Sequence, residues 1–146
     1  MLALAASIQA GESPALRKQI EQGRYLVNIA GCNSCHTPGY LATGSRTSDK
    51  MLLTGSDKGW RGSWGTTYAV NLRLYFDLIT EDQWLQVARE VDRRPTMPYF
   101  ALNAMSKSDL RAIYRYMRHL GPAGSPAPQA LPPGGESPPA YVQFGL

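Results

Sequence analysis

Cys32-Asn33-Ser34-Cys35-His36 is the stretch that decides how the rest of this chain folds, because Cys-x-x-Cys-His is the pattern of a covalent haem attachment site. Two thiols three positions apart can each bond to one vinyl group on the same edge of a porphyrin. The next side chain, His36, then gives the iron an imidazole ligand. The spacing therefore predicts one haem c, bound covalently through Cys32 and Cys35, with His36 on the iron.

Three other interpretations of the motif stay open at this point. A Cys-x-x-Cys pair can be a disulfide redox motif, but such motifs lie near a βαβ pattern, which this sequence lacks. The pair can be half of a structural zinc site, although zinc needs four ligands and only His36 and His119 remain to help. The pattern can also be accidental.

The composition is that of one globular domain. Of the 146 residues, 43% are hydrophobic and 18% are charged, and the formal net charge is +4. The basic side chains are scattered and lack interleaved aromatic residues, so we expect no binding of nucleic acid. We expect the mild positive charge to attract an acidic protein partner. These basic residues are Arg17, Lys18, Arg89, Arg93, Arg94, Arg111, Arg115 and Arg118.

The sequence divides into three parts. Residues 1–12 are interpreted as an N-terminal extension or the remnant of a secretion signal; their apolar start lacks a basic flank and is too short to span a bilayer. Residues 13–121 form the expected domain, and no transmembrane segment is expected. Residues 122–146 are a Pro-rich tail that favours extended backbone. Three bulky residues near its end predict docking on the domain or on a partner, and these are Tyr141, Val142 and Phe144.

The first predicted helix begins at Ser13, whose side chain can cap it, and Pro14 occupies its first position. This helix is expected to run straight into Cys32. Apolar residues recur along one face at helical spacing. Gly23 on this face costs about 1 kcal/mol relative to Ala, so we expect another backbone to cross closely there. The face consists of Leu16, Ile20, Gly23, Val27 and Ala30.

Two further helices are predicted from capping boxes. The second starts at Thr80 with Gln83 and is stopped by Pro95. The third starts at Ser106 with Asp109 and is ended by a Gly-Pro pair. No strand pattern is convincing, so the expected fold is all-α. A hydrophobic staple, in which an apolar residue before the cap packs against one in the first turn, is expected beside each cap: Ile79 with Trp84, and Met105 with Leu110. The expected buried face of the third helix consists of Leu110, Ile113, Tyr114, Met117 and Leu120.

A long stretch rich in Gly, Ser and Thr lies between His36 and Ile79. A structureless loop of this length is unusual within a domain, but it is explained if the haem is the core against which the loop folds. The alternative is a set of surface aromatics with no cofactor. The side chains expected to cover the haem or to bond its edge are Trp60, Trp64, Tyr68, Asn71 and Arg73.

The second axial position of the iron has five candidates, which are Met51, Met97, Met105, Met117 and His119. Met105 and Met117 are explained as a staple and a core residue, His119 as a cation at a helix C-terminus, and Met51 as apolar packing. Met97 lies in a loop between two prolines, whose rings restrict the backbone. We therefore favour Met97, and the alternative is a loop methionine that only packs. A thioether ligand raises the reduction potential.

The order of these elements resembles class I cytochrome c: a helix, the Cys-x-x-Cys-His motif, a long loop, a helix, a Met-Pro loop and a final helix. Gly23 and Tyr25, together with Tyr116, resemble the place where the terminal helices of that family cross. Three runs are similar, more narrowly, to cytochrome domains and subunits of periplasmic alcohol, gluconate and aldehyde-type dehydrogenases. These runs are Gly65-Thr66-Thr67-Tyr68-Ala69-Val70-Asn71-Leu72, Met97-Pro98-Tyr99-Phe100 and Asp109-Leu110-Arg111-Ala112-Ile113-Tyr114-Arg115-Tyr116-Met117.

The resemblance, which extends over residues 15–121, implies a monohaem electron carrier in the periplasm that is not itself an enzyme. It makes Cys32 and Cys35 the thioether positions and His36 the proximal ligand. Met97 becomes the distal ligand. Pro38 lies near His36, and a nearby backbone carbonyl orients the imidazole. The implied partners are a dehydrogenase as electron donor and a terminal oxidase or another cytochrome as acceptor. The alternatives are a cytochrome subunit bound tightly to a dehydrogenase and, less favoured, a ligand-binding or catalytic haem protein.

Overall fold

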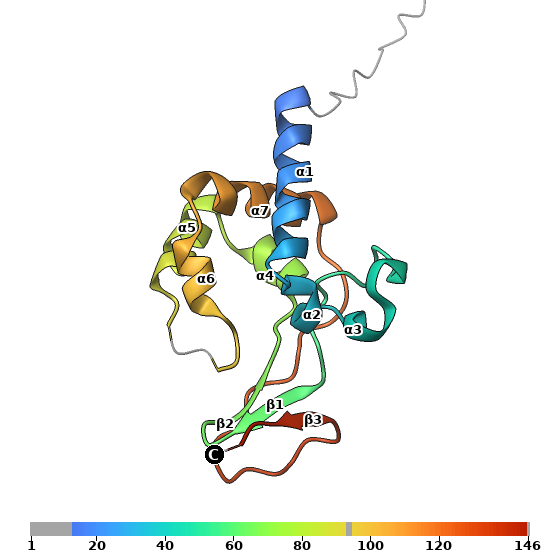
Figure 1. Cartoon of the computed structure of the whole chain (residues 1–146), viewed down its shortest axis with the longest axis vertical. Helices are drawn as coiled ribbons and strands as arrows, with labels where there is room; N and C mark the ends of the chain where they lie inside the picture. The colour runs from blue at the N-terminus through green and yellow to red at the C-terminus, as the bar shows by residue number, and fades with distance from the viewer. Residues whose placement is uncertain (1–12, 93–94, 146) are drawn as a thin grey trace, which may run out of the picture.

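The computed structural model describes residues 13–92 and 95–145 as a helical domain with one small sheet (Figure 1). The predicted extension over residues 1–12 lies outside the described residues. None of the described helices is long and apolar enough to cross a membrane. The elements are α1 (Pro14–Ile29), α2 (Cys32–His36), α3 (Tyr40–Thr43), the 3-10 turn η1 (Gly44–Arg46), β1 (Gly59–Gly62), β2 (Gly65–Tyr68), α4 (Leu72–Leu78), α5 (Glu81–Glu90), α6 (Tyr99–Ala104), α7 (Lys107–Leu120) and β3 (Tyr141–Gln143).

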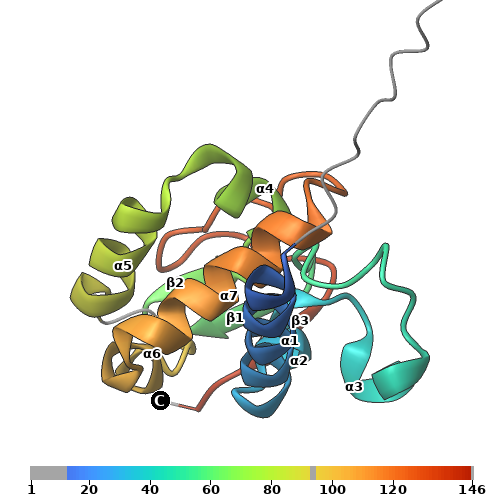
Figure 2. The same cartoon turned by 90° about the horizontal axis from the view of Figure 1, so that it is seen from above.

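Helices α1 and α7 cross at close range, and Figure 2 shows α7 passing across α1. The contact is at Gly23, where a Cβ atom would lie 2.0 Å from the carbonyl oxygen of Ala112 and 2.7 Å from the Cβ of Tyr116. Tyr116 is buried, whereas Tyr25 is 57% exposed. The close backbone crossing predicted from Gly23 is therefore confirmed, and it uses Tyr116 rather than Tyr25.

The three predicted helix starts are also confirmed. Ser13 accepts a hydrogen bond from the backbone of α1, and Thr80 and Gln83 form a complete capping box at α5. Ser106 caps α7, and its hydroxyl donates to the Asp109 carboxylate at 2.7 Å. These side chains satisfy backbone N–H groups that a helix start leaves without intrahelical partners.

The end of α1 differs from the prediction. The helix was expected to run straight into Cys32, but it ends at Ile29 and a separate short helix carries the motif. Gly31 causes this break, because its φ of 72° is in the left-handed region, which glycine adopts without steric cost. The direction of α2, which carries the motif, is therefore not fixed by the axis of α1.

The stretch between His36 and Ile79 folds more than predicted. Asn71 caps an unpredicted helix, α4, and this helix buries Phe76 against Trp84 with ring centroids 4.7 Å apart. The indole N–H of Trp84 donates to the carbonyl of Leu110 at 2.8 Å, which joins α5 to α7. Leu53 is also fully buried. The loop thus contributes its own side chains to the protein core.

The expected all-α fold is corrected by a three-stranded sheet in the order β2-β1-β3. Strand β1 pairs antiparallel with β2, with Trp60 opposite Thr67, and parallel with β3, with Trp60 opposite Val142. The strands were missed because each has only three or four residues, and glycines at both ends of β1 and at the start of β2 hide any alternation of polar and apolar side chains.

The Pro-rich segment after Gly121 packs back onto the hairpin formed by β1 and β2, as the lower part of Figure 1 shows. Phe144 contacts the rings of Trp60 and Trp64, each with centroids 5.9 Å apart. Arg61 donates from its guanidinium to the carbonyls of Gly135 at 2.7 Å and Glu136 at 3.1 Å. The docking predicted from the bulky residues near the end of the chain is therefore seen on the domain itself.

Candidate functional site

Helix α2 presents the two thiols of the motif. Cys32 and Cys35 are three positions apart, close to one helical turn, so they lie on the same side of this helix. Both are unpaired and partly buried. The arrangement offers two sulfurs on one face, followed directly by the imidazole of His36.

The surroundings of the thiols oppose a disulfide redox role. Burial, reinforced by the neighbouring Cys35, raises the pKa of Cys32 to about 11, and burial also raises the pKa of Cys35. Redox-active Cys-x-x-Cys pairs instead depend on a lowered thiol pKa, because the thiolate is the nucleophile. Within residues 13–92 and 95–145, no group of three or more His, Cys, Asp or Glu side chains is arranged so that it could hold a metal ion.

His36 is oriented by a backbone carbonyl. Its Nδ1 lies 2.8 Å from the carbonyl oxygen of Val70, and because a carbonyl only accepts, Nδ1 carries the proton. The lone pair is then on Nε2, as metal binding requires. Burial lowers the pKa of His36, an effect that outweighs the opposing hydrogen bond to Val70. The ring is therefore held as neutral imidazole, and the carbonyl implied by the family resemblance belongs to Val70.

A compact set of hydrogen bonds fixes the backbone around the motif. The amide of Gly55 donates to the carbonyl of His36 at 2.7 Å, and the amide of Leu53 donates to the hydroxyl of Thr37 at 2.7 Å. That hydroxyl in turn donates to the side chain of Asn33, also at 2.7 Å. The carbonyl of Leu53 accepts from the first amide of α4, that of Leu72, at 3.0 Å. The motif, the following loop and the start of α4 therefore form one bonded unit.

Asn71 and Arg73, both predicted to bond the edge of a haem, have structural roles here. The side-chain oxygen of Asn71 caps α4, and its amide nitrogen donates to the carbonyls of Ala123 and Ser125. The buried guanidinium of Arg73 donates to the carbonyl of Gly121 at the end of α7 and to other carbonyls nearby. Sequence reasoning missed both roles, although Asn before a helix is a common capping signal.

The other predicted contact residues are divided between two places. Trp64 lies in the β1–β2 turn, where its indole N–H donates to the carbonyl of Trp60 at 3.3 Å, and Tyr68 ends β2. Pro38 follows α2 and is partly buried. Contacts of these side chains with a porphyrin stay predictions.

The four candidate methionines separate into two pairs. Met105 and Met117 pack in the protein core, as predicted. Met51 and Met97 are 46% and 39% exposed, so the predicted packing of Met51 is wrong. The Met97 loop is anchored by the hydroxyl of Thr67 in β2, which donates to the carbonyl of Pro95 at 2.8 Å. Met97 therefore lies exposed on a loop that is tied to the hairpin.

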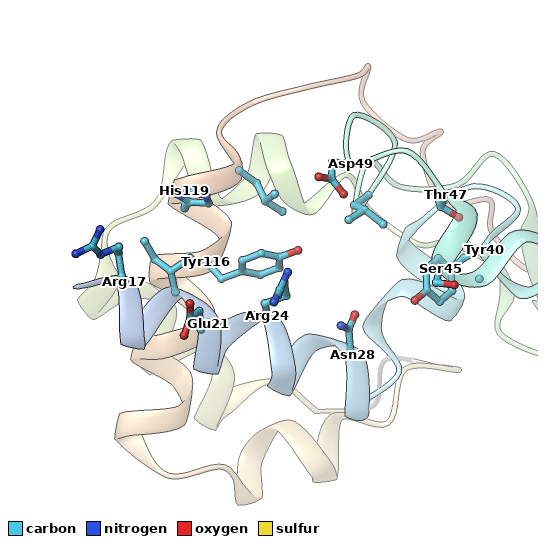
Figure 3. A pocket seen from close by; sticks show the side chains of 14 residues that line it. Arg17, Glu21, Arg24, Asn28, Tyr40, Ser45, Thr47, Asp49, Tyr116 and His119 are labelled. Atoms are coloured by element: carbon cyan, nitrogen blue, oxygen red, sulfur yellow. The ribbon is translucent and has the colours of Figure 1, made fainter. Parts of the chain in front are cut away.

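A hollow of about 530 Å³ lies elsewhere, between α1, the end of α7 and the segment from α3 to Leu52. Figure 3 shows Tyr116 directed into it between Arg24 and Asp49. Of the candidate iron ligands, His119 lines this hollow, whereas His36 and Met97 do not. It is therefore separate from the motif.

The chain is similar to the fructose dehydrogenase cytochrome subunit of Gluconobacter japonicus. The identity is 28% over 132 aligned residues, which cover 80% of this chain and 24% of that protein. The chain thus spans about a quarter of the length of this relative. No protein-family model matches the sequence, and no solved structure matches it significantly. The similarity supports a relationship to cytochromes.

Proposed function

We propose that this chain is a monohaem c-type cytochrome that transfers single electrons. Cys32 and Cys35 hold the haem through thioether bonds, and His36 and Met97 are the axial ligands. The observation that carries the proposal is the pairing of two unbonded thiols on one face of α2 with an imidazole whose Nδ1 is already held by Val70. The similarity to a named cytochrome subunit supports it independently.

The bound haem would supply a reversible one-electron iron couple, and the chain would tune and shield it. The carbonyl of Val70 increases the basicity of His36 through the ring N–H, which stabilises ferric iron. The soft sulfur of Met97 acts in the opposite direction and favours ferrous iron. Val70, Met97 and Phe100 are large apolar side chains left exposed in the protein alone, and a porphyrin is a suitable apolar surface to cover such residues.

Met97 is preferred over Met51 as the residue that would supply a second ligand to a bound haem, because that ligand would have to come from a part of the chain that is not bonded to the backbone of His36. Met51 belongs to the loop in which the amide of Gly55 donates to the carbonyl of His36 and the amide of Leu53 donates to the hydroxyl of Thr37. That loop is therefore on the side of His36. Met97 belongs to a separate segment, which is joined to the domain through the hydroxyl of Thr67 in β2 rather than through the backbone of the motif.

The proposed partner is a dehydrogenase that donates electrons, with a terminal oxidase or another cytochrome as the acceptor. The proposed location is the periplasm, because bacteria attach haem covalently outside the cytoplasm. The similarity to a dehydrogenase subunit favours a second form of this proposal, in which the chain is a tightly bound cytochrome subunit or part of one. Size-exclusion chromatography with and without a candidate dehydrogenase separates a stable subunit from a diffusing carrier.

The spectrum of the native protein tests the haem proposal. The reduced alkaline pyridine haemochrome should have the band positions of a haem with two thioethers, and the oxidised protein should show the weak near-infrared band of sulfur on iron. The Met97→Ala substitution should abolish the near-infrared band, while Met51→Ala should retain it as the matched control. Loss of the band in Met51→Ala alone would assign the ligand to Met51, and rapid carbon monoxide binding by the reduced wild type would contradict a filled sixth position.

A further inference from the structure

The loop that holds His36 is itself held by the C-terminal segment through Asn71. Val70, whose carbonyl accepts the imidazole proton, directly precedes Asn71 in the chain. The amide nitrogen of Asn71 donates to the carbonyl of Ala123 at 2.8 Å and to that of Ser125 at 3.0 Å. Because Asn71 is 4% exposed and its oxygen caps α4, its side-chain amide is fully used within the protein.

The other neighbour of Val70 is bonded as well. The carbonyl of Ala69 accepts from the amide of Ser56 at 3.0 Å. Gly55 packs so closely that a Cβ atom there would lie 2.8 Å from the backbone nitrogen of Asn71. Val70 itself keeps its side chain 46% exposed. The position of its carbonyl is therefore set by the bonds of its neighbours rather than by burial of its own side chain.

We propose that Asn71 is a positioning residue for the axial imidazole, and that the C-terminal segment acts through it to set the reduction potential. This inference rests on the proposed haem function. A strong hydrogen bond from Nδ1 of His36 makes the ring a more basic ligand, which stabilises ferric iron and lowers the potential. Freeing Asn71 from the carbonyls of Ala123 and Ser125 loosens Val70, weakens that bond and raises the potential.

Two glycines of the C-terminal segment provide a matched pair of variants. Gly124 and Gly134 have similar left-handed backbones, with φ of 73° and 77°. A Cβ atom on Gly124 would lie 3.1 Å from the Cβ of Thr54 and 3.2 Å from the side-chain nitrogen of Asn71, whereas one on Gly134 would meet nothing within 4 Å. The Gly124→Ala and Gly134→Ala substitutions therefore impose similar backbone strain, and only the first presses on Asn71 and Thr54.

The experiment compares the two variants with wild type as purified haem-loaded proteins. At a fixed electrode potential, Gly124→Ala should raise the ratio of reduced to oxidised protein several-fold, and Gly134→Ala should leave it unchanged. In the reduced protein, hydrogen exchange of the His36 Nδ1 proton, followed by nitrogen-15 NMR, should be faster in Gly124→Ala alone. A purely structural role of the segment would move neither quantity.

The Asn71→Ser substitution tests the same contact from its other side and decides the question if Gly124→Ala does not fold. Serine caps a helix well but lacks the two amide protons, so α4 should persist while the potential and the proton exchange rise. Equal potentials and exchange rates in Gly124→Ala, Asn71→Ser and wild type, with haem attached in each, would overturn this inference and leave the haem proposal intact. A wild type without attached haem would overturn the proposed function instead.

Discussion

The crossing of α1 and α7 and the lobe formed by the β1–β2 hairpin with the C-terminal segment are held together in different ways. The crossing buries side chains along two helices that are separated by most of the sequence, with a glycine at the point of contact. The lobe buries few side chains. Its contacts are backbone hydrogen bonds, the guanidinium of Arg61 on two carbonyls, and the rings of Trp60, Trp64 and Phe144.

This difference implies that the two regions have separate stabilities. Removing a buried contact from the helical crossing affects the only large core of the described residues, so it should lower global stability. Removing a contact from the lobe should open the C-terminal segment locally and leave the helices folded. The candidate site lies between the two regions, because α2 follows α1 directly and Asn71 bonds to the C-terminal segment.

The largest effect is expected from Gly23→Ala at the helical crossing. A methyl group has no room 2.0 Å from the carbonyl oxygen of Ala112, so the helices must separate. The free energy of unfolding should fall by about 3 kcal/mol, measured by urea denaturation. At a helix position with free space around it, the change from Gly to Ala would raise the free energy of unfolding. A decrease at Gly23 would therefore indicate the close contact with Ala112. The exposed neighbour Gln22→Ala is the control, with a change within about 0.5 kcal/mol.

A smaller and local effect is expected from Gly65→Ala in the lobe. A Cβ atom there would lie 2.1 Å from the carbonyl oxygen of Leu131, and φ of Gly65 is 100°. The C-terminal segment should lose about 2 kcal/mol of protection, seen by hydrogen-exchange mass spectrometry as faster exchange in residues 131–145. Exchange in α7 should not change. Equal loss of protection in both regions would show that they form a single cooperative unit.

The cap of α5 is expected to contribute about 1 kcal/mol to global stability. The Thr80→Ala substitution removes the hydroxyl that accepts from the amide of Gln83 at 3.2 Å, and urea denaturation should show the loss. Thr80→Ser keeps the hydroxyl and serves as the control. A loss of similar size in both variants would assign the effect to the methyl group instead of the cap.

The smallest effect is expected at Glu81, whose carboxylate pairs with Arg111 at 3.1 Å and Arg115 at 2.7 Å between α5 and α7. Both arginine side chains are about half exposed, so solvent screens the pairs. Glu81→Gln should cost about 0.5 kcal/mol at low salt, and the difference from wild type should vanish at high salt. A cost that persists at high salt would show that packing, not charge, is what Glu81 supplies.

The contrast between the two regions also explains how far the sequence predicts this fold. The starts of α1, α5 and α7 have side-chain signals close to them in the sequence, at Ser13, Thr80 and Ser106, and these predictions were correct. The strands lack such a signal, because the order of β1 beside β3 depends on a backbone pairing between residues about 80 positions apart. Backbone hydrogen bonds are possible for nearly every residue, so a single sequence does not reveal which pairs form.

In the candidate site, too, features with a local signal in the sequence are predictable, and contacts between distant residues are not. Local spacing predicts the haem motif and favours Met97 for its position between prolines, and both stay predictions. The partner of His36 was not predictable, because the Val70 carbonyl lies 34 positions away and any backbone carbonyl is chemically equivalent. For Asn71 the sequence predicts a contact with the haem edge and gives no sign of its bonds to Ala123 and Ser125, since an amide that donates to these carbonyls has the same chemistry as one that donates to a propionate.

Mass spectrometry of one peptide tests the central claim most directly. Trypsin cleaves after Arg24 and Arg46 and releases residues 25–46, which contain both cysteines and His36 but no other cleavage site. From protein matured in its native host, this peptide should carry the mass of one haem and have no thiol that reacts with an alkylating reagent. A peptide of unmodified mass, with both thiols free or joined in a disulfide, would contradict the account.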